Sequence, residues 1–351
     1  MKILGINISH DASSCLVEDG NIVYYCEEER LSKNKHHIPS MYDSKFYGIE
    51  KLKKYNIKEI DHLIFVTFGR DNKNEDLILT KLIMDKIKKE GISINNYHLN
   101  TEEHHLYHAY LGHYLSGFDH SVTIVMDGAG AYLNQTPRYR EIESIYYFDN
   151  NIKTIYKHYS NFNIGADKEL IVNKNNESYE MIFSNSYGVG SIFGNFTKAL
   201  GFQNSGADAG KTMGMSSYGK LKSNNIEWFD HYNDNYFFNI KTFDELNKAS
   251  LTQDFNEKAD IAKKIQFETK EYTLKIIEKA IEKTQAKNIV LSGGYFLNCV
   301  NNYEYLKAFP NVNFYIDPIC YDGGTAIGAV YALHKSLNLP FNPINNLYLG
   351  G

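Results

Sequence analysis

A pattern of strand, small polar loop and hairpin occurs twice in this sequence, and it constrains the fold more than any other feature. The first copy begins with alternating apolar residues over Lys2–Ile8 and has its hairpin turn at Asp19-Gly20. The second copy begins with the apolar strand Val122–Met126 and has its turn at 149–151. Two copies of one supersecondary pattern predict an internally duplicated fold with two lobes.

Strands and helices alternate along the rest of the chain. Apolar residues recur at helical spacing over the longer stretches, whereas short β-branched runs indicate buried strands. This alternation, with an antiparallel hairpin in each half, predicts an α/β fold with mixed sheets. We expect helices at Glu75–Lys89, Glu102–Leu115, Phe255–Thr284, Asn301–Ala308 and Gly324–Ser336, and further strands at Leu63–Phe68, Asn288–Ser292 and Phe314–Ile316.

The composition restricts the class of protein. The 351 residues include 37 basic and 42 acidic side chains, a formal charge of −5, and 43% are hydrophobic, as in globular proteins. No apolar run reaches the roughly 20 residues that a membrane helix needs. The four cysteines form no CxxC pair. We therefore expect a cytoplasmic protein without a membrane partner, and the net charge does not support a nucleic-acid partner.

Histidines cluster in one short segment, where six of the 13 lie within residues 98–120. On a helix, His104 and His108 lie one turn apart on one face, a spacing that lets two imidazoles bind one metal ion. Asp127 and Asp322 each stand next to glycines, in loops where a carboxylate can point into a cleft. These four donors suit Fe(II), Mn(II) or Zn(II). The alternative is a pair of solvated histidines on a helix surface.

Glycine-based loops form a second group of candidates. Gly293-Gly294 follows a strand and Gly323-Gly324 precedes a helix, so each loop can bring backbone N–H groups close to a phosphate or ribose. The sequence contains neither a GxxxxGK[ST] motif nor a GxGxxG motif after its first strand, which disfavours Walker-type ATPases and Rossmann dehydrogenases. The alternative is that these loops are ordinary turns.

The segment Gly206–Gly219 is rich in small residues and allows two interpretations. Lys211 offers a positive charge for a phosphate, and Asp208 could accept a proton. The alternative is a surface loop.

Taken together and in order, the motifs resemble the N-terminal domain of the O-carbamoyltransferases, a family that includes nodulation-factor, cephamycin and aminoglycoside carbamoyltransferases. The resemblance spans essentially the whole chain. It rests on Leu4–Asn7, His10–Ser13, Glu27–Leu31, Lys35-His36, His104–Ala109, Met126–Gly128, Gly210–Met215, Ser292–Gly294, Leu297–Cys299, Asn302, Asp322–Gly324 and Ile327–Ala329.

This resemblance implies a duplicated fold of the actin, sugar-kinase and Hsp70 superfamily, related to the enzyme that transfers threonylcarbamoyl to tRNA. Its first lobe would comprise residues 1–120, and its second, with the nucleotide loops, residues 121–351. The family binds Fe(II) through residues that match His104, His108, Asp127 and Asp322. It transfers the carbamoyl group of carbamoyl-adenylate to a hydroxyl group, with carbamoyl phosphate and ATP as the ultimate donors.

The resemblance also implies roles for individual residues. Candidates for the general base are Asp208, His10 and Asp11. The residues expected to contact the nucleotide are Lys35, Gly128, Lys211, Gly293, Gly294, Asn298, Asn302, Gly323 and Gly324.

In this family a YrdC-like domain that follows in the same chain makes the adenylate. The present sequence ends at Asn346–Gly351, where family members are still completing the first domain. We therefore expect a YrdC-like domain to act in cis in a longer chain or in trans as a partner.

Three other functions stay open on the sequence. One is a kinase or ATPase of the same superfold, although such kinases do not need an HxxxH metal site. Another is a tRNA threonylcarbamoyl-type transferase, and the third is a nucleotide-dependent binding or scaffold subunit. The acceptor is expected to be a small molecule or another hydroxylated compound.

Overall fold

The structure is a computed structural model of the chain, and it describes residues 1–42, 45–69, 73–133, 138–161, 168–174, 177–221, 227–232, 234–339 and 342. The chain forms two compact units. The first comprises Met1–Asp119, Ala131–Asn134 and Asp317–Gly351, and the second comprises His120–Gly130 and Gln135–Ile316. The end of the chain at Asn346–Gly351 lies outside the described residues.

A five-stranded mixed sheet forms the centre of the first unit, with the order β3-β2-β1-β4-β5. The first three strands form an antiparallel meander, and β4 and β5 run parallel to β1. The bounds of these strands are β1 (Lys2–Asn7), β2 (Ser13–Glu18), β3 (Asn21–Glu27), β4 (Glu59–Val66) and β5 (Ser93–Asn100).

The second unit repeats this topology within a seven-stranded sheet of order β14-β13-β6-β7-β8-β10-β9. Here β6, β7 and β8 form the antiparallel meander, and β13 and β14 run parallel to β6. The strands are β6 (Ser121–Met126), β7 (Arg140–Phe148), β8 (Ile152–Ser160), β9 (Lys168–Lys174), β10 (Glu177–Ser184), β13 (Asn288–Ser292) and β14 (Asn313–Ile316), with a separate pair β11 (Phe229–Tyr232) and β12 (Asn235–Phe238). The predicted duplication and the mixed sheets are confirmed.

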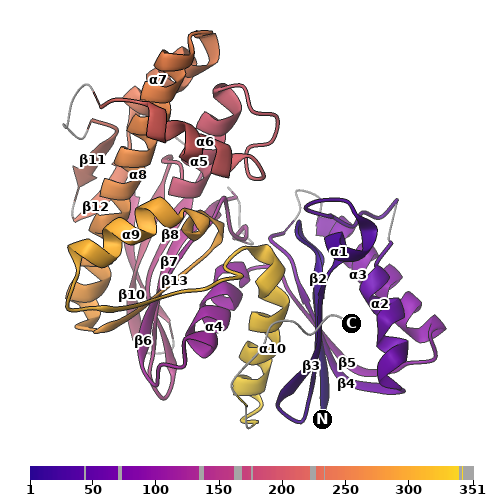
Figure 1. The fold of residues 1–351 in the computed structure, drawn as a ribbon. Coiled ribbons are helices and arrows are strands. Elements are labelled where there is room, and N and C mark those ends of the chain that lie inside the picture. Colours follow the sequence, from indigo (N-terminus) through magenta and orange to yellow (C-terminus); the bar gives the residue numbers. More distant parts are fainter. Residues whose placement is uncertain are drawn as a thin grey trace. The chain divides into compact units, whose positions relative to one another are not determined.

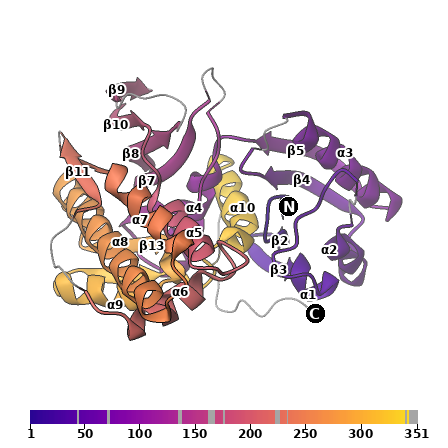
Figure 2. The same ribbon diagram turned by 90° about the horizontal axis from the view of Figure 1, so that it is seen from above.

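Helices accompany both sheets (Figures 1 and 2). Those of the first unit are α1 (Glu28–Ser32), α2 (Tyr47–Lys51), α3 (Lys73–Lys89), α4 (His104–Ser116) and α10 (Thr325–Ser336), with short 3-10 helices η1 (Leu52–Tyr55) and η4 (Asp322–Gly324). Those of the second are α5 (Val189–Ala199), α6 (Ala209–Met215), α7 (Ile240–Leu251), α8 (Phe255–Thr284) and α9 (Cys299–Ala308), with η2 (Ser216–Tyr218) and η3 (Gly294–Leu297).

The side chains of β1 alternate between two covered faces of the first sheet. Leu4 and Ile6 belong to the same buried cluster as Leu79 and Ile83 of α3. On the other face, a Cβ at Gly5 would lie 2.3 Å from the Ala326 carbonyl oxygen of α10, so only glycine fits there. Figure 1 shows α10 between the sheet and α4. This packing brings η4, at the start of α10, to the helix that carries the histidine cluster.

Two features differ from the expectations. The second lobe was predicted to continue to residue 351, but Asp317–Gly351 groups with the first unit because α10 packs on β1, β4 and α4. The segment Gly206–Gly219, for which a surface loop was the alternative, contains α6 and η2. Among the described residues, none of the helices combines the length and apolar character needed to cross a bilayer.

Candidate metal centre and nucleotide loops

Two histidines of α4 meet one carboxylate of η4 inside the first unit. The Nε2 atoms of His104 and His108 lie 3.3 Å apart. They lie 3.2 Å and 3.4 Å, respectively, from Oδ1 of Asp322. All three side chains are buried. The one-turn spacing of the two histidines on α4 explains why both imidazoles reach the same point.

Glycines allow this close approach between α4 and the start of α10. A Cβ at Gly328 would lie 1.9 Å from the Tyr107 carbonyl oxygen. A Cβ at Gly324 would lie 2.4 Å from the side chain of Leu111. Since real Cβ atoms do not come so close to other atoms, larger residues would push η4 and α10 away from α4.

The backbone of Asp322 is held from β1 and from the first residue of α10. The side-chain amide of Asn7 donates a 3.0 Å hydrogen bond to the Asp322 carbonyl oxygen, and the hydroxyl of Thr325 donates one of 2.6 Å to the same atom. The carboxylate also accepts a 3.0 Å hydrogen bond at Oδ2 from the Ser9 hydroxyl. Oδ1 is therefore left facing the two imidazoles.

Burial alone would raise the pKa of Asp322. The neighbouring imidazoles of His10 and His104 outweigh that effect and hold the pKa of this carboxyl well below its usual range. The carboxylate is thus ionised in its buried setting, as a metal ligand must be. Two imidazole nitrogens and one carboxylate oxygen fit a first-row transition ion such as Fe(II), Mn(II) or Zn(II).

The fourth predicted ligand, Asp127, belongs to the second unit. It follows β6, is buried, and accepts a 3.1 Å hydrogen bond at Oδ1 from the backbone N–H of Gly294. The parallel pairing of β6 with β13 explains this contact, because the two strands end at the same edge of the sheet. Within the second unit, Asp127 therefore lies beside the predicted nucleotide loop.

The five candidate nucleotide glycines differ in what surrounds them. A Cβ at Gly293, whose φ is 100°, would lie 2.1 Å from the Met126 carbonyl oxygen. At Gly294, Gly323 and Gly324, protein atoms likewise lie within 2.8 Å of such a Cβ. Only Gly128 among the five has no atom within 4 Å of its Cβ position, so a side chain there would face open space. Packing against the protein itself is sufficient to explain the other four glycines.

The two candidate asparagines take part in hydrogen bonds near the start of α9. The Asn298 side chain accepts from the Asn301 N–H at 3.2 Å, and its Oδ1 and Nδ2 pair with the amide of Gln266 at 2.7 Å and 3.1 Å. Asn302 donates a 2.6 Å hydrogen bond to the Phe296 carbonyl oxygen. Both residues are buried, and these bonds give them a structural role in this loop.

The charged candidates are distributed over both units. Lys35 is exposed in the first unit. Asp208 and Lys211 belong to the second, where the Lys211 ammonium lies 2.7 Å from the Asp208 carboxylate. That contact, followed by the Asn204 N–H, lowers the pKa of Asp208. Since a carboxylate paired in this way is a weaker base, the contact disfavours Asp208 as the group that removes a proton.

His10 and Asp11 lie beside the cluster of His104, His108 and Asp322. Nε2 of His10 is 3.3 Å from Oδ2 of Asp322, and Nδ1 is 2.8 Å from Asp11. Asp11 also contacts His36 at 2.6 Å, and with Glu29 these residues form a second His–carboxylate group. Site prediction from the sequence included neither Ser9, His36 nor Glu29. His36 and Glu29 belong to motifs that carry the family resemblance, and this membership could have identified them as site residues.

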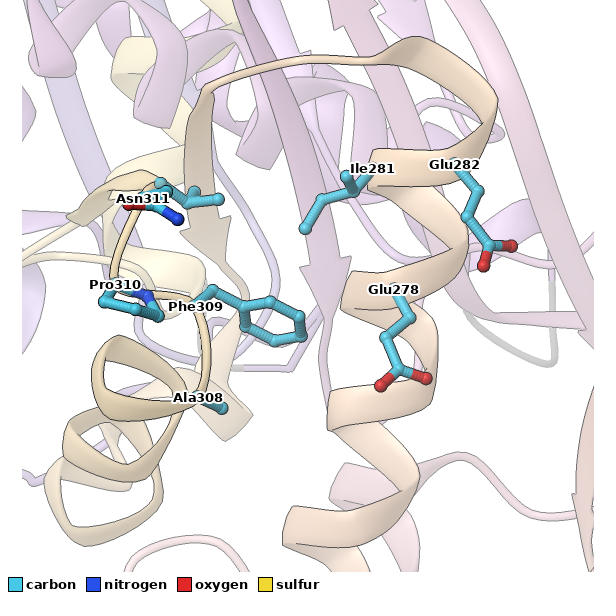
Figure 3. Close-up of a pocket in the computed structure, with 8 residues that line it drawn as sticks. Glu278, Ile281, Glu282, Ala308, Phe309, Pro310 and Asn311 are labelled. Carbon is cyan, nitrogen blue, oxygen red and sulfur yellow. The ribbon is translucent and has the colours of Figure 1, made fainter.

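A surface depression of about 340 Å³ lies elsewhere in the second unit, between the end of α8 and the loop after α9 (Figure 3). Phe309 points toward α8, where Glu278 and Glu282 carry the acidic groups of the rim. None of the predicted site residues lines this depression.

The duplicated mixed sheets and the buried histidine–carboxylate cluster define an α/β protein with a candidate metal site. Residues 71–331 match the family model described as the carbamoyltransferase N-terminus. Because this match covers more than half of the sequence, the chain belongs to that family.

Two curated proteins are similar to this chain over nearly its whole length. The chain is 26% identical to an uncharacterized protein of Methanocaldococcus jannaschii, over 99% of this chain and 60% of that protein. It is 22% identical to the nodulation protein NolNO of Sinorhizobium fredii, over 97% of this chain and 49% of that protein. The chain thus spans about half of NolNO.

In fold, the chain is similar to full-length HypF in its phosphate- and nucleotide-bound form. The TM-score is 0.56 at 15% identity, covering 96% of this chain and 46% of HypF. HypF of T. kodakarensis gives a TM-score of 0.59 at 12% identity, covering 96% of this chain and 48% of that one. At these identities the similarity concerns the fold.

Proposed function

We propose that this chain transfers a carbamoyl group from carbamoyl-adenylate to a hydroxyl group of an acceptor. The observation that carries the proposal is the buried cluster of His104, His108 and Asp322, in a chain that belongs to the carbamoyltransferase N-terminus family. The acceptor class that we propose is a small molecule or another hydroxylated compound. The match to the carbamoyltransferase N-terminus model supports carbamoyl transfer in general.

In this proposal His104, His108 and Asp322 hold Fe(II), and Asp127 supplies a fourth ligand. When bound, the ion supplies Lewis-acid chemistry, which polarises the carbonyl group and neutralises the phosphate leaving group. The protein contributes the buried setting of the three first-unit ligands, because two rings and one carboxylate are already collected there. Little rearrangement of these three side chains is then needed on binding.

We further propose that the open space beside the Cβ position of Gly128 receives the nucleotide part of the donor. The absence of described atoms within 4 Å of its Cβ position and its place after β6 support that role. The similar HypF structure is a nucleotide-bound form, which supports a nucleotide site in this fold. Lys35 and Lys211 are the cations that we propose for phosphate contacts, because both side chains carry exposed positive charge.

Among the three candidates, His10 is the general base that we propose. Its side chain is 49% exposed and lies beside Asp322, whereas Asp208 is paired with Lys211. The acceptor O–H gives its proton to Nε2 of His10 while the oxygen forms a bond to the carbamoyl carbon. The bond from that carbon to the phosphate oxygen breaks, and AMP leaves with the electron pair. Such base assistance contributes roughly 10²–10⁴ in rate.

A YrdC-like domain, in cis or in trans, is our proposed source of the carbamoyl-adenylate. Mixed anhydrides hydrolyse readily, so direct delivery to a water-poor site would protect the donor. This assignment follows from the family resemblance and the chemistry of the donor.

Anaerobic metal analysis tests the first part of the proposal. Wild type is expected to bind iron, and His108→Ala should lose most of it because one of the collected nitrogens is removed. The matched control is His120→Ala, which removes an exposed histidine that is not one of the proposed ligands. Equal iron content in wild type and His108→Ala would contradict the assignment.

Carbamoyl transfer is then measured with the iron-loaded chain, a YrdC-like enzyme, carbamoyl phosphate, ATP and a panel of alcohols. Mass spectrometry should detect a carbamate ester whose formation requires the chain and is abolished in His104→Ala. A threonylcarbamoyl product on tRNA in place of the carbamate would favour the related tRNA-modifying function. Nucleotide binding without any product would favour a binding subunit.

A further inference from the structure

The side chain of Asn7 is buried at the end of β1, the central strand of the first sheet. The backbone of Asn7 pairs with Ser13 of β2 on one side and with Val66 of β4 on the other. Alternation along the strand places this side chain on the same face as Gly5, the face that α10 covers. Asn7 is therefore fixed at its base by two neighbouring strands, which hold a side chain more precisely than a loop does.

The partners of the Asn7 amide determine its orientation. Its Oδ1 accepts a 2.9 Å hydrogen bond from the backbone N–H of Ser9. Its Nδ2 donates to three carbonyl oxygens, those of His10 and Asp11 at 3.2 Å each and that of Asp322 at 3.0 Å. A backbone N–H only donates and a carbonyl oxygen only accepts, so the opposite orientation would set donor against donor and acceptor against acceptor.

This single amide joins two parts of the first unit that are far apart in the sequence. One is the turn at His10-Asp11, in which Asp11 has a φ of 55°, in the left-handed region. Such a conformation persists where surrounding contacts hold it. The other is η4, whose Asp322 lies 315 positions after Asn7 and presents its carboxylate to the two imidazoles of α4. The turn and the ligand loop are thus held against the same strand.

We propose that Asn7 is a positioning residue of the metal centre. By donating to the Asp322 carbonyl oxygen, it holds η4 where Oδ1 of Asp322 faces the imidazoles of His104 and His108. By donating to the turn at His10-Asp11, it keeps the neighbouring loop on the same support. This inference rests on the metal centre of the proposed function, and it adds a residue that acts on the metal through one of the ligands.

Two substitutions remove the N–H donors in different ways. Asn7→Ala deletes the amide and leaves buried carbonyl oxygens without this partner. Asn7→Asp keeps nearly the same shape, but a carboxylate only accepts hydrogen bonds and would face the same carbonyl oxygens. In both variants the Asp322 carbonyl oxygen keeps its 2.6 Å hydrogen bond from the Thr325 hydroxyl, so the start of α10 keeps a contact of its own.

Titration of Zn(II) against a chromophoric chelator measures the effect without turnover. We expect Asn7→Ala to raise the Kd for Zn(II) about 10- to 100-fold, the usual effect of losing a group that orients a metal ligand. Asn7→Asp is the sharper test, because its added negative charge alone would tighten the binding of a cation, whereas lost positioning weakens it. Asn96→Asp, at an exposed residue of β5 whose amide donates to the Asp61 carbonyl oxygen, is the matched control and should keep the wild-type Kd. A Kd at or below the wild-type value in either Asn7 variant would overturn the proposal.

A spectroscopic measurement separates positioning from a general loss of stability. At saturating Co(II) only folded, metal-bound molecules contribute the visible absorption bands, which report the geometry of the ligands. We expect these bands to change in Asn7→Ala and to stay as in wild type in Asn96→Asp, and identical bands in wild type and Asn7→Ala would refute the positioning role. If the metal measurements behave as expected but wild type transfers no carbamoyl group, the proposed function fails and the role of Asn7 stands. A wild type that binds neither Zn(II) nor Co(II) would refute both.

Discussion

At the scale of the residue, Gly128 differs from the other glycines of the nucleotide loops because its Cβ position is open. We expect Gly128→Val to leave the thermal midpoint near that of wild type and to weaken nucleotide binding at least about tenfold, a loss of about 1.4 kcal/mol. The reason is that the branched side chain occupies space where the ligand approaches the backbone. Calorimetric titration with ADP measures the affinity.

Gly293→Ala is the contrasting variant. Its Cβ would meet the Met126 carbonyl oxygen, and its φ of 100° disfavours any side chain, so we expect a loss of stability. A stable Gly128→Val protein that binds ADP with wild-type affinity would show that this loop does not contact the nucleotide.

Glu28 gives a residue-scale prediction for pH. Burial raises the pKa of this carboxyl to about 7, although it accepts hydrogen bonds from the N–H groups of Gly48 and Tyr47 at 2.7 Å and 2.6 Å. The pKa is higher in the folded chain than the ordinary value of 4.5, so the folded state holds the proton more tightly. Stability is therefore lost as pH rises from about 4.5 to 7, by up to about 3 kcal/mol.

Urea unfolding of wild type and Glu28→Gln at pH 5 and pH 8 measures this effect. The variant lacks the titrating group, so its unfolding free energy relative to wild type should rise between the two pH values. Glu282→Gln, at an exposed position of α8, serves as the control. A constant difference between wild type and Glu28→Gln at both pH values would contradict the prediction.

The convergence of His104 and His108 could be predicted from the sequence, because the one-turn spacing on a helix determines that two rings share a face. The contact between Asp11 and His36 could not. These residues are 25 positions apart, and neither position carries the glycine that most clearly marks a left-handed backbone. The tight packing of Gly323 and Gly324 could not be predicted either, since a double glycine is equally typical of a loop that binds a ligand.

At the scale of the element, the crossing of α4 and α10 controls the histidine–carboxylate cluster. A Cβ at Gly328 would lie 1.9 Å from the Tyr107 carbonyl oxygen, so Gly328→Ala should force the helices apart. We expect a loss of about 1–3 kcal/mol in unfolding free energy and weaker iron binding, because α4 and η4 carry the ligands. Denaturant unfolding and metal titration measure the two effects.

Gly214→Ala is the matched control for that substitution. Gly214 lies in α6 and has no atom within 4 Å of its Cβ position. Alanine favours helix over glycine by up to about 1 kcal/mol, so this variant should be at least as stable as wild type. If Gly328→Ala behaved in the same way, the proposed close crossing would be wrong.

The helices and strands differ in how well they can be predicted from the sequence. The periodicity of Phe255–Thr284 predicts a helix with the same bounds as α8. By contrast, β5 has the polar sequence SINNYHLN and no alternation, since it is an edge strand with much of its surface exposed. The sequence did not predict α6, because glycines favour a loop over a helix. Its contacts with α8 and α5 stabilise this helix despite those glycines.

At the scale of the whole molecule, the first unit is made from distant parts of the chain. Residues 1–119 alone lack α10, which covers one face of β1 and packs on α4. We expect the fragment Met1–Asp119 to stay largely unfolded and the fragment His120–Ile316 to fold. Circular dichroism and NMR dispersion of the two fragments measure this difference.

Joining Met1–Asp119 to Asp317–Leu339 through a flexible Gly/Ser linker should restore folding of the first unit, because α10 is returned to its sheet. Cooperative unfolding of Met1–Asp119 without that segment would show that α10 is not needed. Sequence reasoning placed residues 121–351 in one lobe because the repeat marks where the second copy starts. The repeat contains no signal that α10 packs in the first unit.

The discontinuous first unit also has a consequence for synthesis on the ribosome. Strands β1 to β5 and helix α4 emerge first, but α10 ends only at Ser336, after all of the second unit has been translated. Until then the face of β1 around Gly5 has no cover, and exposed apolar surface of this kind promotes aggregation. The unit that is begun first is completed last, so the nascent chain passes through a long stage at which a chaperone that shields apolar surface would protect it.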